Sequence, residues 1–259
     1  MRAVTFSNPN GLSAAFSTDT PMMFLESFNG NSCGACAITQ KPIEFDGQRL
    51  ISSSLNARTI ELAVNFGGIA DGRYSHSAAL EKWDLIQKIF VPGVVGTLTW
   101  TNGIVSRFIR CRTTETPDCT RLLPFLYRAE FQLIADLPLW LDSTQQAVAL
   151  SGGASATISN DCGIAVPFRV EASVSAGAAF AMHSAAADAG LGFTAASSGV
   201  FTIDTAECTV TDSGGERVNS LLTPQSEFFK LLPGTNRITF AGTGASTQIF
   251  WRKAYMGVK

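Results

Sequence analysis

The sequence predicts a mainly β protein with one notable helix, divided into two domains near residue 145. Three observations support this fold class. Several short runs alternate apolar and polar residues, which is the pattern of half-buried strands. One segment before residue 92 repeats its apolar residues at helical spacing instead. After about residue 143 the chain becomes small, polar or Ala/Gly-rich, which marks a boundary between domains 1–144 and 145–259.

Strands and one hairpin are predicted in the first domain. Residues 59–66 alternate apolar and polar side chains and are expected to form a strand with one buried face. Asn102-Gly103 joins two alternating runs, and both residues tolerate the positive φ angles of a tight hairpin turn. We expect the second strand of this hairpin at 104–112 and a further strand at 125–133.

A helix is predicted over residues 77–90. Ser77 is suited to cap its first turn, and Pro92-Gly93 follows its end. The apolar face of the helix comprises Leu80, Trp83, Ile86 and Phe90. A helix with one such face is expected to pack against the core of the first domain.

The second domain is predicted to be an antiparallel β-sandwich. Its strands are short, and turn residues such as Asp212-Ser213-Gly214-Gly215 and Pro233-Gly234 separate them. The expected strands are 164–170, 200–204, 208–211, 228–231, 237–240 and 248–252. A sandwich is a scaffold, so it does not by itself indicate a function.

The composition points to assembly. Apolar types make up 46% of the 259 residues and charged types only 15%, compared with about 25% charged residues in an average soluble domain. A protein with so few charges is expected to cover part of its apolar surface with other copies or with partners. The formal net charge of −2 argues against specific binding of nucleic acid, because such binding depends on clustered Lys and Arg.

Membrane insertion and secretion are not expected. The Ala-rich segment 172–193 is interrupted by His183 and Asp188, whereas a membrane-spanning helix needs about 20 predominantly apolar residues. The first nine residues lack the apolar stretch of a secretory signal. We therefore expect the chain to fold in a cytosol, where its six cysteines remain free thiols.

The titratable residues form no recognisable catalytic motif. His76 is expected to take a capping or surface role beside the helix, and His183 to lie in a solvated loop. Asp204, Glu207 and Asp212 are close in sequence, but Asp in a turn-rich segment commonly bonds its own backbone. No catalytic residues and no cofactor site are expected, so the chain is not predicted to be an enzyme.

The cysteine pattern is compatible with several kinds of site. Cys33-Gly34-Ala35-Cys36 has the spacing of half a zinc site or of a redox pair. Cys111 and Cys119 are the other candidate zinc ligands, but their wide spacing favours free thiols near a turn, and no metal site is predicted. Cys162 and Cys208 are expected to be small buried apolar residues.

Arginines and glycines give no ligand motif. Arg107, Arg110 and Arg112 share one predicted strand, with Arg107 on the opposite face from the other two, so they make no single basic stripe. Protection of a sheet edge or an ion pair across an interface accounts for them. No glycine-rich loop opens a helix after a strand, as a phosphate site requires.

Both ends of the chain are unusually apolar. Residues 249–258 are rich in aromatics, whereas frayed ends are normally polar, so this end is expected to be docked as a strand or held by a partner. The first forty residues show too little periodicity for a core of their own, although residues 22–25 are strongly apolar. They are expected to gain order by lying against a neighbour.

The order of several weak motifs is more informative than any one of them. The motifs are residues 58–62, the helix around 80–85, and residues 96–100, 130–140, 199–205, 228–238 and 251–258. Their order and spacing resemble the distal tail proteins of siphophages over most of the chain. The resemblance implies an N-terminal β-sandwich belt domain in 1–144 and a C-terminal galectin-like antiparallel β-sandwich in 145–259.

The resemblance also implies a function and partners. Proteins of this family form a hexameric ring at the tail tip, and DNA passes through its lumen. The ring joins the tail tube and tape-measure proteins to the tail-tip hub and receptor-binding proteins. The implied partners are therefore copies of the chain itself and these tail proteins, and the implied location is the virion, after assembly in the host cytoplasm.

A cell-wall glycan-binding module for host adhesion is the alternative function. Phe250, Trp251 and Tyr255 would supply aromatic faces on which a sugar stacks, although strand aromatics usually pack inward. The second half lacks the His, Asn, Arg, Trp and Glu pattern through which galectins hold a sugar, and its sole tryptophan is Trp251.

Overall fold

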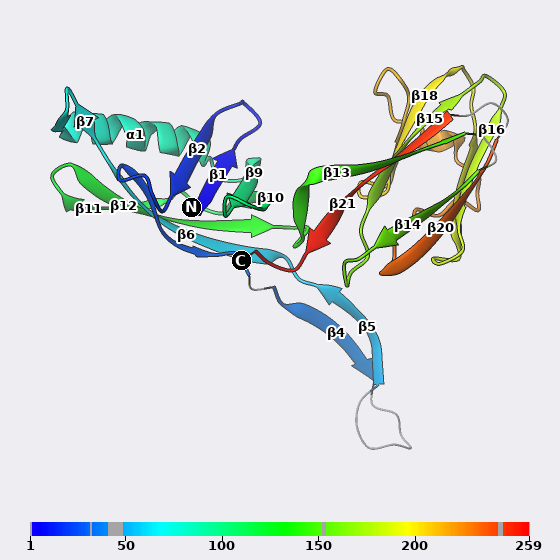
Figure 1. Cartoon of the computed structure of the whole chain (residues 1–259), viewed down its shortest axis with the longest axis horizontal. Helices are drawn as coiled ribbons and strands as arrows, with labels where there is room; N and C mark the ends of the chain where they lie inside the picture. The colour runs from blue at the N-terminus through cyan, green and yellow to red at the C-terminus, as the bar shows by residue number, and fades with distance from the viewer. Residues whose placement is uncertain (1, 32, 41–48, 152–153, 243–245, 259) are drawn as a thin grey trace. The chain divides into compact units, whose positions relative to one another are not determined.

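The computed structural model describes residues 2–31, 33–40, 49–151, 154–242 and 246–258 (Figure 1). They divide into two compact units. The first unit comprises Met1–Leu141 with Met256–Lys259, and the second comprises Asp142–Tyr255. The chain therefore leaves the first unit once and returns to it. The prediction of a mainly β protein with one notable helix is confirmed.

The first unit is built on a sheet whose strands close into a ring. Its strands are β1 (Ala3–Ser7), β2 (Ser13–Ser17), β3 (Met23–Asn29), β6 (Arg58–Gly67), β9 (Val95–Thr101), β10 (Ser106–Thr113), β11 (Asp118–Leu123) and β12 (Leu126–Ala135). They pair in the order β11-β12-β6-β3-β2-β1-β9-β10, and β10 also pairs with β12. The predicted strands at 59–66 and 125–133 are confirmed as β6 and β12.

Residues 3–29 contribute to this core, so for them the expectation that the first forty residues depend on a neighbour is wrong. Val4, Phe6 and Phe16 are at most 1% exposed. The Phe6 ring stacks on Phe90 with centroids 4.6 Å apart, and Phe6 lies opposite Leu98 of β9. Each of β1 and β2 has only five residues, so the periodicity of one strand is too short to recognise. The partner strand that completes their buried face lies about ninety residues later in the sequence.

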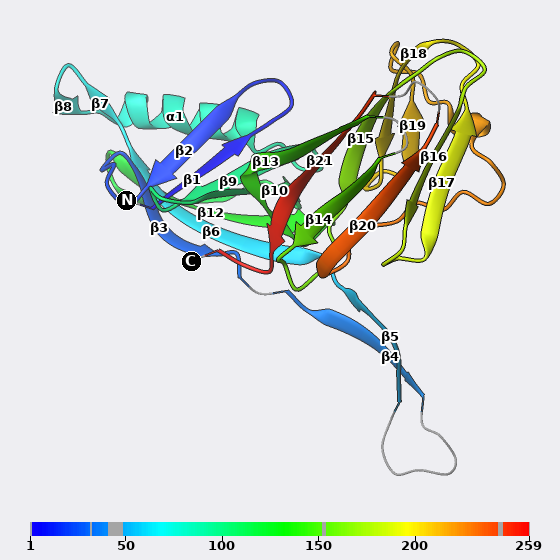
Figure 2. The same ribbon diagram turned by 45° about the vertical axis from the view of Figure 1, so that its right-hand side comes forward.

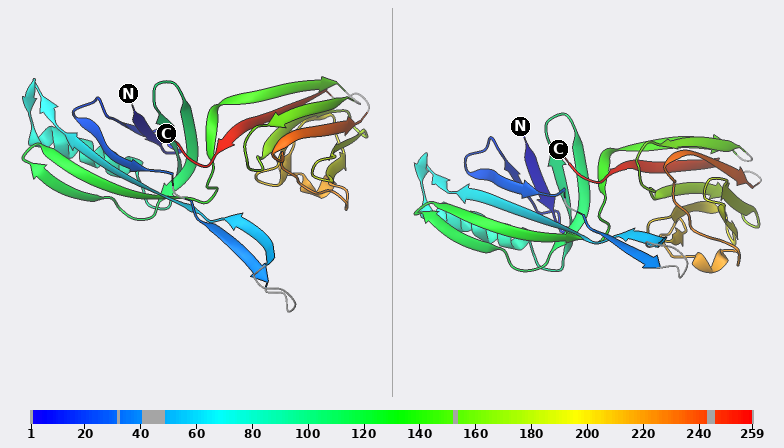
Figure 3. Two further views of the ribbon diagram at one scale, coloured as in Figure 1. Left: turned by 60° about the horizontal axis from the view of Figure 1, so that its bottom comes forward. Right: turned by 90° about the horizontal axis from the view of Figure 1, so that it is seen from below.

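The helix α1 (His76–Ile89) packs across β2, β6 and β12 (Figure 3). Its N-cap is Ser75, whose side chain accepts a hydrogen bond from the Ala78 amide at 3.3 Å, so the prediction of Ser77 as cap is wrong. Ile86 and Phe90 are buried as predicted, whereas Leu80 is 41% exposed and Ala79 takes the buried position. The first helical turn lies against the backbone at Gly68, where only a small side chain fits between helix and strand.

Several hairpins join consecutive strands of the first unit, among them β1–β2 and β11–β12. The hairpin of β9 and β10 is confirmed, but its loop has four residues, and Ile104 is in the loop with 92% of its surface exposed. Asn102 Oδ1 accepts hydrogen bonds from the Ile104 and Val105 amides, which stabilises this longer turn. Two hairpins form separate two-stranded sheets: β4 (Ala35–Gln40) with β5 (Arg49–Leu55), and β7 (Ile69–Ala70) with β8 (Arg73–Tyr74).

The second unit is an antiparallel sandwich of two sheets, as predicted (Figure 2). One sheet has the order β13-β21-β15-β18-β19 and the other β14-β20-β16-β17. Their strands are β13 (Trp140–Ser151), β14 (Ser155–Asn160), β15 (Phe168–Val174), β16 (Ala179–Ser184), β17 (Ala189–Thr194), β18 (Gly199–Asp204), β19 (Thr209–Thr211), β20 (Gly234–Ala241) and β21 (Ser246–Tyr255). Buried apolar residues of both sheets, such as Val170, Ile203, Ile238 and Ile249, form one core.

Several strand predictions in the second unit need correction. Residues 228–231 are not a strand, because Leu231 forms only an isolated bridge with Val166, and the buried Phe229 and Leu231 reach the core from a loop. The strand expected at 164–170 begins at Phe168. A short 3-10 helix, η1 (Asn219–Leu221), follows β19. Across the described ranges, no helix is long and apolar enough to cross a membrane.

Candidate functional site

Both histidines are exposed, and Asp204 and Asp212 form hydrogen bonds within their own turns. His76 is the exposed first residue of α1, and its Nδ1 lies 2.9 Å from Tyr127 Oη, as expected for a surface role. His183 is exposed on strand β16 and not in a loop, because the Ala-rich segment around it is β-structure despite its weak strand propensity. Asp204 and Asp212 each accept hydrogen bonds from two backbone amides of their own turns, which confirms that prediction.

The cysteines lie in different environments. The Cys33 thiol donates to the carbonyl oxygens of Gly34 and Asn56 at 3.5 Å, while the side chain of Cys36 lies outside the described residues. Cys111 is buried inside the first unit, where desolvation raises its pKa to about 12. Cys119 is exposed on the edge strand β11. Within the part of the chain that the structure describes, no three His, Cys, Asp or Glu side chains gather into a metal-binding group.

The remaining two cysteines differ from each other. Cys162 is buried as predicted, and its sulfur accepts a hydrogen bond from the Ala254 amide at 3.1 Å. Cys208 is exposed, contrary to the prediction, because it is in the tight turn between β18 and β19 with a φ angle of 53°. A residue in this left-handed conformation belongs to the turn rather than to the alternating strand that follows it.

A buried arginine joins three separate backbone segments of the first unit. Arg58 is fully buried and donates to the carbonyl oxygens of Gly30 at 2.7 Å, Pro138 at 2.9 Å and Met256 at 2.6 Å. Desolvation lowers the pKa of its guanidinium. The planar guanidinium offers five donors in a fixed geometry, so one side chain can satisfy several carbonyl groups that would otherwise be unpaired. We call Arg58 and these three carbonyls the arginine clamp.

The C-terminal residues are held beside this clamp. Arg107 donates to the Gly257 carbonyl oxygen at 2.6 Å, and the Val258 amide donates to Asn31 Oδ1 at 2.7 Å. Val258 is only 2% exposed. Because β21 is hydrogen-bonded between β13 and β15, the expectation that this end docks as a strand is confirmed.

The alternation of β6 indicates that Arg58 is buried, although Arg58 was not predicted as a functional residue. Arg58 is two residues before Ile60 and four before Leu62, so it lies on the buried face of β6. Arg107 likewise lies on the inward side of β10, opposite Arg110 and Arg112, as the alternation predicted. Arg112 forms an ion pair with Asp136 of the same chain. A charged residue at a core position of an alternating strand indicates a buried hydrogen-bonding role.

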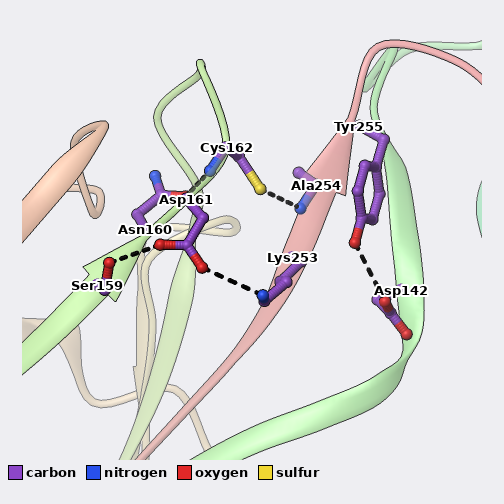
Figure 4. A network of polar contacts seen from close by, with 8 residues as sticks. All are labelled: Asp142, Ser159, Asn160, Asp161, Cys162, Lys253, Ala254 and Tyr255. Atoms are coloured by element: carbon purple, nitrogen blue, oxygen red, sulfur yellow. Dashed lines mark hydrogen bonds and ion pairs between the residues drawn. The ribbon is translucent and has the colours of Figure 1, made fainter.

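A second polar network lies where the chain enters and leaves the second unit (Figure 4). Tyr255 Oη donates to Asp142 Oδ2 at 3.3 Å, which links the last residue of this unit to its first. Lys253 forms an ion pair with Asp161 at 3.2 Å, and Ser159 donates to the same carboxylate at 2.6 Å. The hydrogen bond from Ser159 has the largest effect on the pKa of the Asp161 carboxyl, and it lowers this pKa together with the hydrogen bond from Lys253. The network fixes the end of β21 against the loop after β14.

The outer surface of the first unit carries an acidic groove. It has a volume of about 430 Å³, and its lining includes Glu61, Glu115, Asp118, Arg128 and Glu130. Arg128 forms ion pairs with Glu130 and, at 2.7 Å, with Glu26, and both interactions raise its pKa. Apart from Arg128, every charged side chain in the lining of the groove is negative, so the groove is unsuited to a phosphate group.

Large apolar side chains remain exposed mainly on the first unit. Among the described residues they are Leu12, Ile69, Tyr74, Leu80, Leu85, Val91, Val95, Ile104, Leu122, Leu123, Leu137, Val200, Leu232 and Met256. Only Val200 and Leu232 belong to the second unit. The apolar surface that the composition predicted is therefore concentrated on the unit with the closed sheet.

Comparisons with known proteins agree with the resemblance. Residues 165–255 match the family model of the siphovirus-type tail component, C-terminal domain. This segment lies within the second unit. No curated protein matches the sequence.

Solved structures match the fold over nearly the whole chain. The crystal structure of the Dit protein (gp 19.1) of phage SPP1 has a TM-score of 0.71 at 16% identity, covering 97% of this chain and 99% of that chain. The phage P2 baseplate in its activated conformation with Ca contains a chain with a TM-score of 0.56 at 9% identity, covering 100% of both chains. The same baseplate with Sr gives a TM-score of 0.54 at 8% identity, over 96% and 98%.

The family match covers most of the second unit, and the likeness in fold to SPP1 Dit covers both units. The predicted resemblance is thereby confirmed. Residues 165–255 therefore match the siphovirus-type tail components, and the chain as a whole has the fold of SPP1 Dit, a distal tail protein of a siphophage.

Proposed function

We propose that this chain forms a closed ring, with six copies, at the tip of a siphophage tail. The first unit forms the ring, and the galectin-like second unit projects from it. The ring joins the tail tube and tape-measure proteins on one side to the tail-tip hub and receptor-binding proteins on the other, and DNA passes through its lumen. The protein acts as a structural component and not as an enzyme.

The observation that carries this proposal is the likeness of both units, in one chain, to SPP1 Dit, a protein described as a paradigm of the hub adsorption apparatus of phages that infect Gram-positive bacteria. The family match in the second unit supports the same role. The exposed apolar side chains of the first unit supply surface for contacts between copies. A weakly acidic chain also suits a DNA conduit, because a strongly basic lumen would retain the phosphate backbone.

The glycan-binding alternative has less support from the geometry. Phe250 and Trp251 are neighbours on β21, so their side chains point to opposite faces of the sheet. The guanidinium of Arg169 lies 5.1 Å from the centroid of the Phe250 ring, and Trp251 packs against the core of the sandwich. These two rings therefore do not form one platform on which a sugar stacks.

The oligomeric state of the purified full-length chain tests the proposed ring. Native mass spectrometry and light scattering are expected to give six copies, and negative-stain images are expected to show closed rings. Cryo-electron microscopy of intact tails should then place the ring at the tip. A chain that stays monomeric at high concentration, together with tails that lack the ring, would contradict the proposal. Titration with cell-wall polysaccharides, read by tryptophan fluorescence, tests the alternative.

A further inference from the structure

The sequence contains three Asn-Gly pairs, and each lies in a different environment. They are Asn10-Gly11, Asn29-Gly30 and Asn102-Gly103. Asparagine is a thermolabile residue, and it is most reactive before glycine, because a residue without a side chain leaves the asparagine carboxamide open to attack by the next backbone nitrogen. The structure therefore decides which of the three pairs reacts in the folded chain.

The reaction is a deamidation of asparagine whose only co-reactant is water. The backbone nitrogen of the glycine loses its proton to hydroxide and forms a bond with Cγ of the asparagine. The bond from Cγ to Nδ2 breaks, and ammonia leaves with a proton from water. Water then adds to one of the two carbonyl groups of the resulting succinimide ring and opens it to aspartate or isoaspartate. The carboxamide must therefore be free to turn toward the glycine nitrogen.

The Asn29-Gly30 pair is held on its glycine side. Asn29 is the last residue of β3, and its Nδ2 donates to Glu61 Oε2 on β6 at 3.4 Å. Gly30 is buried, and its carbonyl oxygen accepts hydrogen bonds from Arg58 Nη1 at 2.7 Å and from Trp140 Nε1 at 3.0 Å. Formation of a succinimide requires Gly30 to move, so these contacts protect Asn29.

The Asn102-Gly103 pair is held on its asparagine side. Asn102 Oδ1 accepts hydrogen bonds from the Ile104 amide at 3.1 Å and the Val105 amide at 2.9 Å. The Gly103 amide donates to Thr101 Oγ1 at 3.2 Å. Attack on Cγ requires the carboxamide to turn, which breaks both hydrogen bonds of its oxygen. The loop therefore protects Asn102, although Gly103 is exposed.

The Asn10-Gly11 pair has an exposed carboxamide. Both residues are exposed in the turn between β1 and β2, beside the C-terminal end of α1 (Figure 2). The Gly11 amide donates to the Asn8 carbonyl oxygen at 3.2 Å. Among the residues that the structure describes, none forms a hydrogen bond with the Asn10 carboxamide. It can turn toward the Gly11 nitrogen, so only the hydrogen bond of the Gly11 amide opposes the attack.

We propose that Asn10 is the site at which the folded protein deamidates, and that Asn29 and Asn102 stay intact while the chain is folded. The site uses water and releases ammonia. This inference goes beyond the proposed ring and does not depend on it, because it is drawn from contacts within one copy.

Deamidation of Asn10 changes a turn that is tied to α1. The buried Asn8 side chain donates to the carbonyl oxygens of Lys88 and Ile89 and accepts from the Asn10 and Leu12 amides. Isoaspartate adds a methylene carbon to the backbone after the amide of residue 10, so the two amides no longer fit the same oxygen atom. Either product also brings a negative charge to the turn that binds the C-terminal end of α1, where the helix dipole is negative. We therefore expect the modified chain to unfold at a lower temperature.

Peptide mapping of the purified full-length chain tests the assignment. One sample is incubated folded at pH 8, and a second is incubated at the same pH in guanidinium chloride. Mass spectrometry gives the rate of deamidation at each Asn-Gly pair. In the folded chain Asn10 is expected to react at least about tenfold faster than Asn29 or Asn102, which is the effect of one or two hydrogen bonds that must break first. In guanidinium chloride the three rates are expected to be similar.

Two matched variants check the product. Asn10→Gln and Asn29→Gln each replace an exposed asparagine of an Asn-Gly pair, and glutamine reacts more slowly because it must close a larger ring. Isoelectric focusing of the incubated folded chain should show a more acidic species that is lost in Asn10→Gln and kept in Asn29→Gln. Calorimetry of the separated acidic species should give a lower unfolding temperature than that of the intact chain, and an equal temperature would contradict the effect on the turn.

The inference is wrong if Asn29 or Asn102 reacts as fast as Asn10 in the folded chain, or if Asn10 does not react. It is also wrong if the three rates have the same ratios in guanidinium chloride as in the folded chain, because the structure would then have no part in the selection. All of these rates can be measured whether or not the chain forms a ring. Failure of this inference therefore leaves the proposed function unaffected.

Discussion

Arg58 Nη2 lies 2.6 Å from the carbonyl oxygen of Met256, so a side chain of β6 holds the backbone 198 residues later in the sequence. The same guanidinium binds Pro138, which precedes the point where the chain leaves the first unit. Met256 is the first residue after the chain returns. One side chain therefore fixes the first unit on both sides of the inserted second unit.

Replacement of Arg58 by Met is expected to destabilise the first unit strongly. The variant keeps an apolar stem of similar length but removes the donors to the Gly30, Pro138 and Met256 carbonyl groups. Buried carbonyls left unpaired should lower the free energy of unfolding by on the order of 3 to 5 kcal/mol. Urea denaturation measures this loss.

Arg121→Met is the control for this prediction, because Arg121 is exposed on the edge strand β11. Its free energy of unfolding should stay within about 0.5 kcal/mol of that of the unchanged chain. Equal stabilities of the Arg58 and Arg121 variants would show that the arginine clamp contributes nothing.

Gly68→Ala should prevent normal packing of α1. A Cβ atom at this position would lie 2.2 Å from the Ser75 carbonyl oxygen and 2.3 Å from the Ala79 amide nitrogen, both of which are backbone atoms. We expect a loss of about 3 kcal/mol in the free energy of unfolding. Gly163→Ala is the matched control, since nothing lies within 4 Å of its Cβ position. Thermal and urea denaturation of both variants compare the two sites.

The Asp161 carboxylate should stabilise the second unit at neutral pH but not in acid. Hydrogen bonds from Ser159 and Lys253 lower its pKa below the ordinary value of 3.8. Its contribution is therefore present above that ordinary value and is lost as the pH falls through the lowered pKa. Asp161→Asn should be less stable than the unchanged chain at pH 7, and the difference should shrink toward pH 2.

Urea denaturation at several pH values gives this comparison. Asp84→Asn, at an exposed position of α1, serves as the control and should show no such pH-dependent difference. A difference for Asp161→Asn that stays constant from pH 7 to pH 2 would argue against the ion pair with Lys253.

Cys111 should make the protein sensitive to alkali. Burial raises the pKa of its thiol from the ordinary value of 9.0 to about 12, so the unfolded thiol ionises at a lower pH than the folded one. The stabilising contribution is present below pH 9.0 and is lost as the pH rises toward 12. Across this window the free energy of unfolding should fall by about 1.4 kcal/mol per pH unit more than in Cys111→Ala.

Thiol labelling provides an independent check on the cysteines. In the native protein at pH 8, exposed Cys119 and Cys208 should react rapidly with a water-soluble reagent, whereas buried Cys111 and Cys162 should react only after unfolding. Mass spectrometry of the labelled peptides identifies the order. Rapid labelling of Cys111 would contradict its placement inside the first unit.

Strong alternation and turn residues predicted part of the fold correctly. The strand at 59–66 has four apolar residues on one face, and the Asn102-Gly103 hairpin joins strands that are adjacent in sequence. Such local signals are visible without knowledge of the partner strand. The turns of Asp204 and Asp212 were predictable for the same reason, since each carboxylate bonds amides within four residues.

The sequence did not predict the elements whose stability depends on distant partners. Strands β16 and β17 consist largely of Ala, Gly and Phe, and their β-structure comes from pairing with each other and with β20. The N-cap of α1 is Ser75 and not the predicted Ser77, because the backbone at Gly68 fixes where the helix begins. The arginine clamp was missed because its acceptors, Gly30, Pro138 and Met256, are spread over the whole chain.

The hydrogen bond between Tyr255 and Asp142 has a consequence for engineering. The second unit begins and ends at these two bonded residues, while the chain on either side of it belongs to the first unit. The sandwich is therefore a domain inserted into the first unit. Another domain with adjacent termini can replace it without interrupting the first unit at a second place. Such an exchange changes the sandwich while the surrounding first unit stays the same.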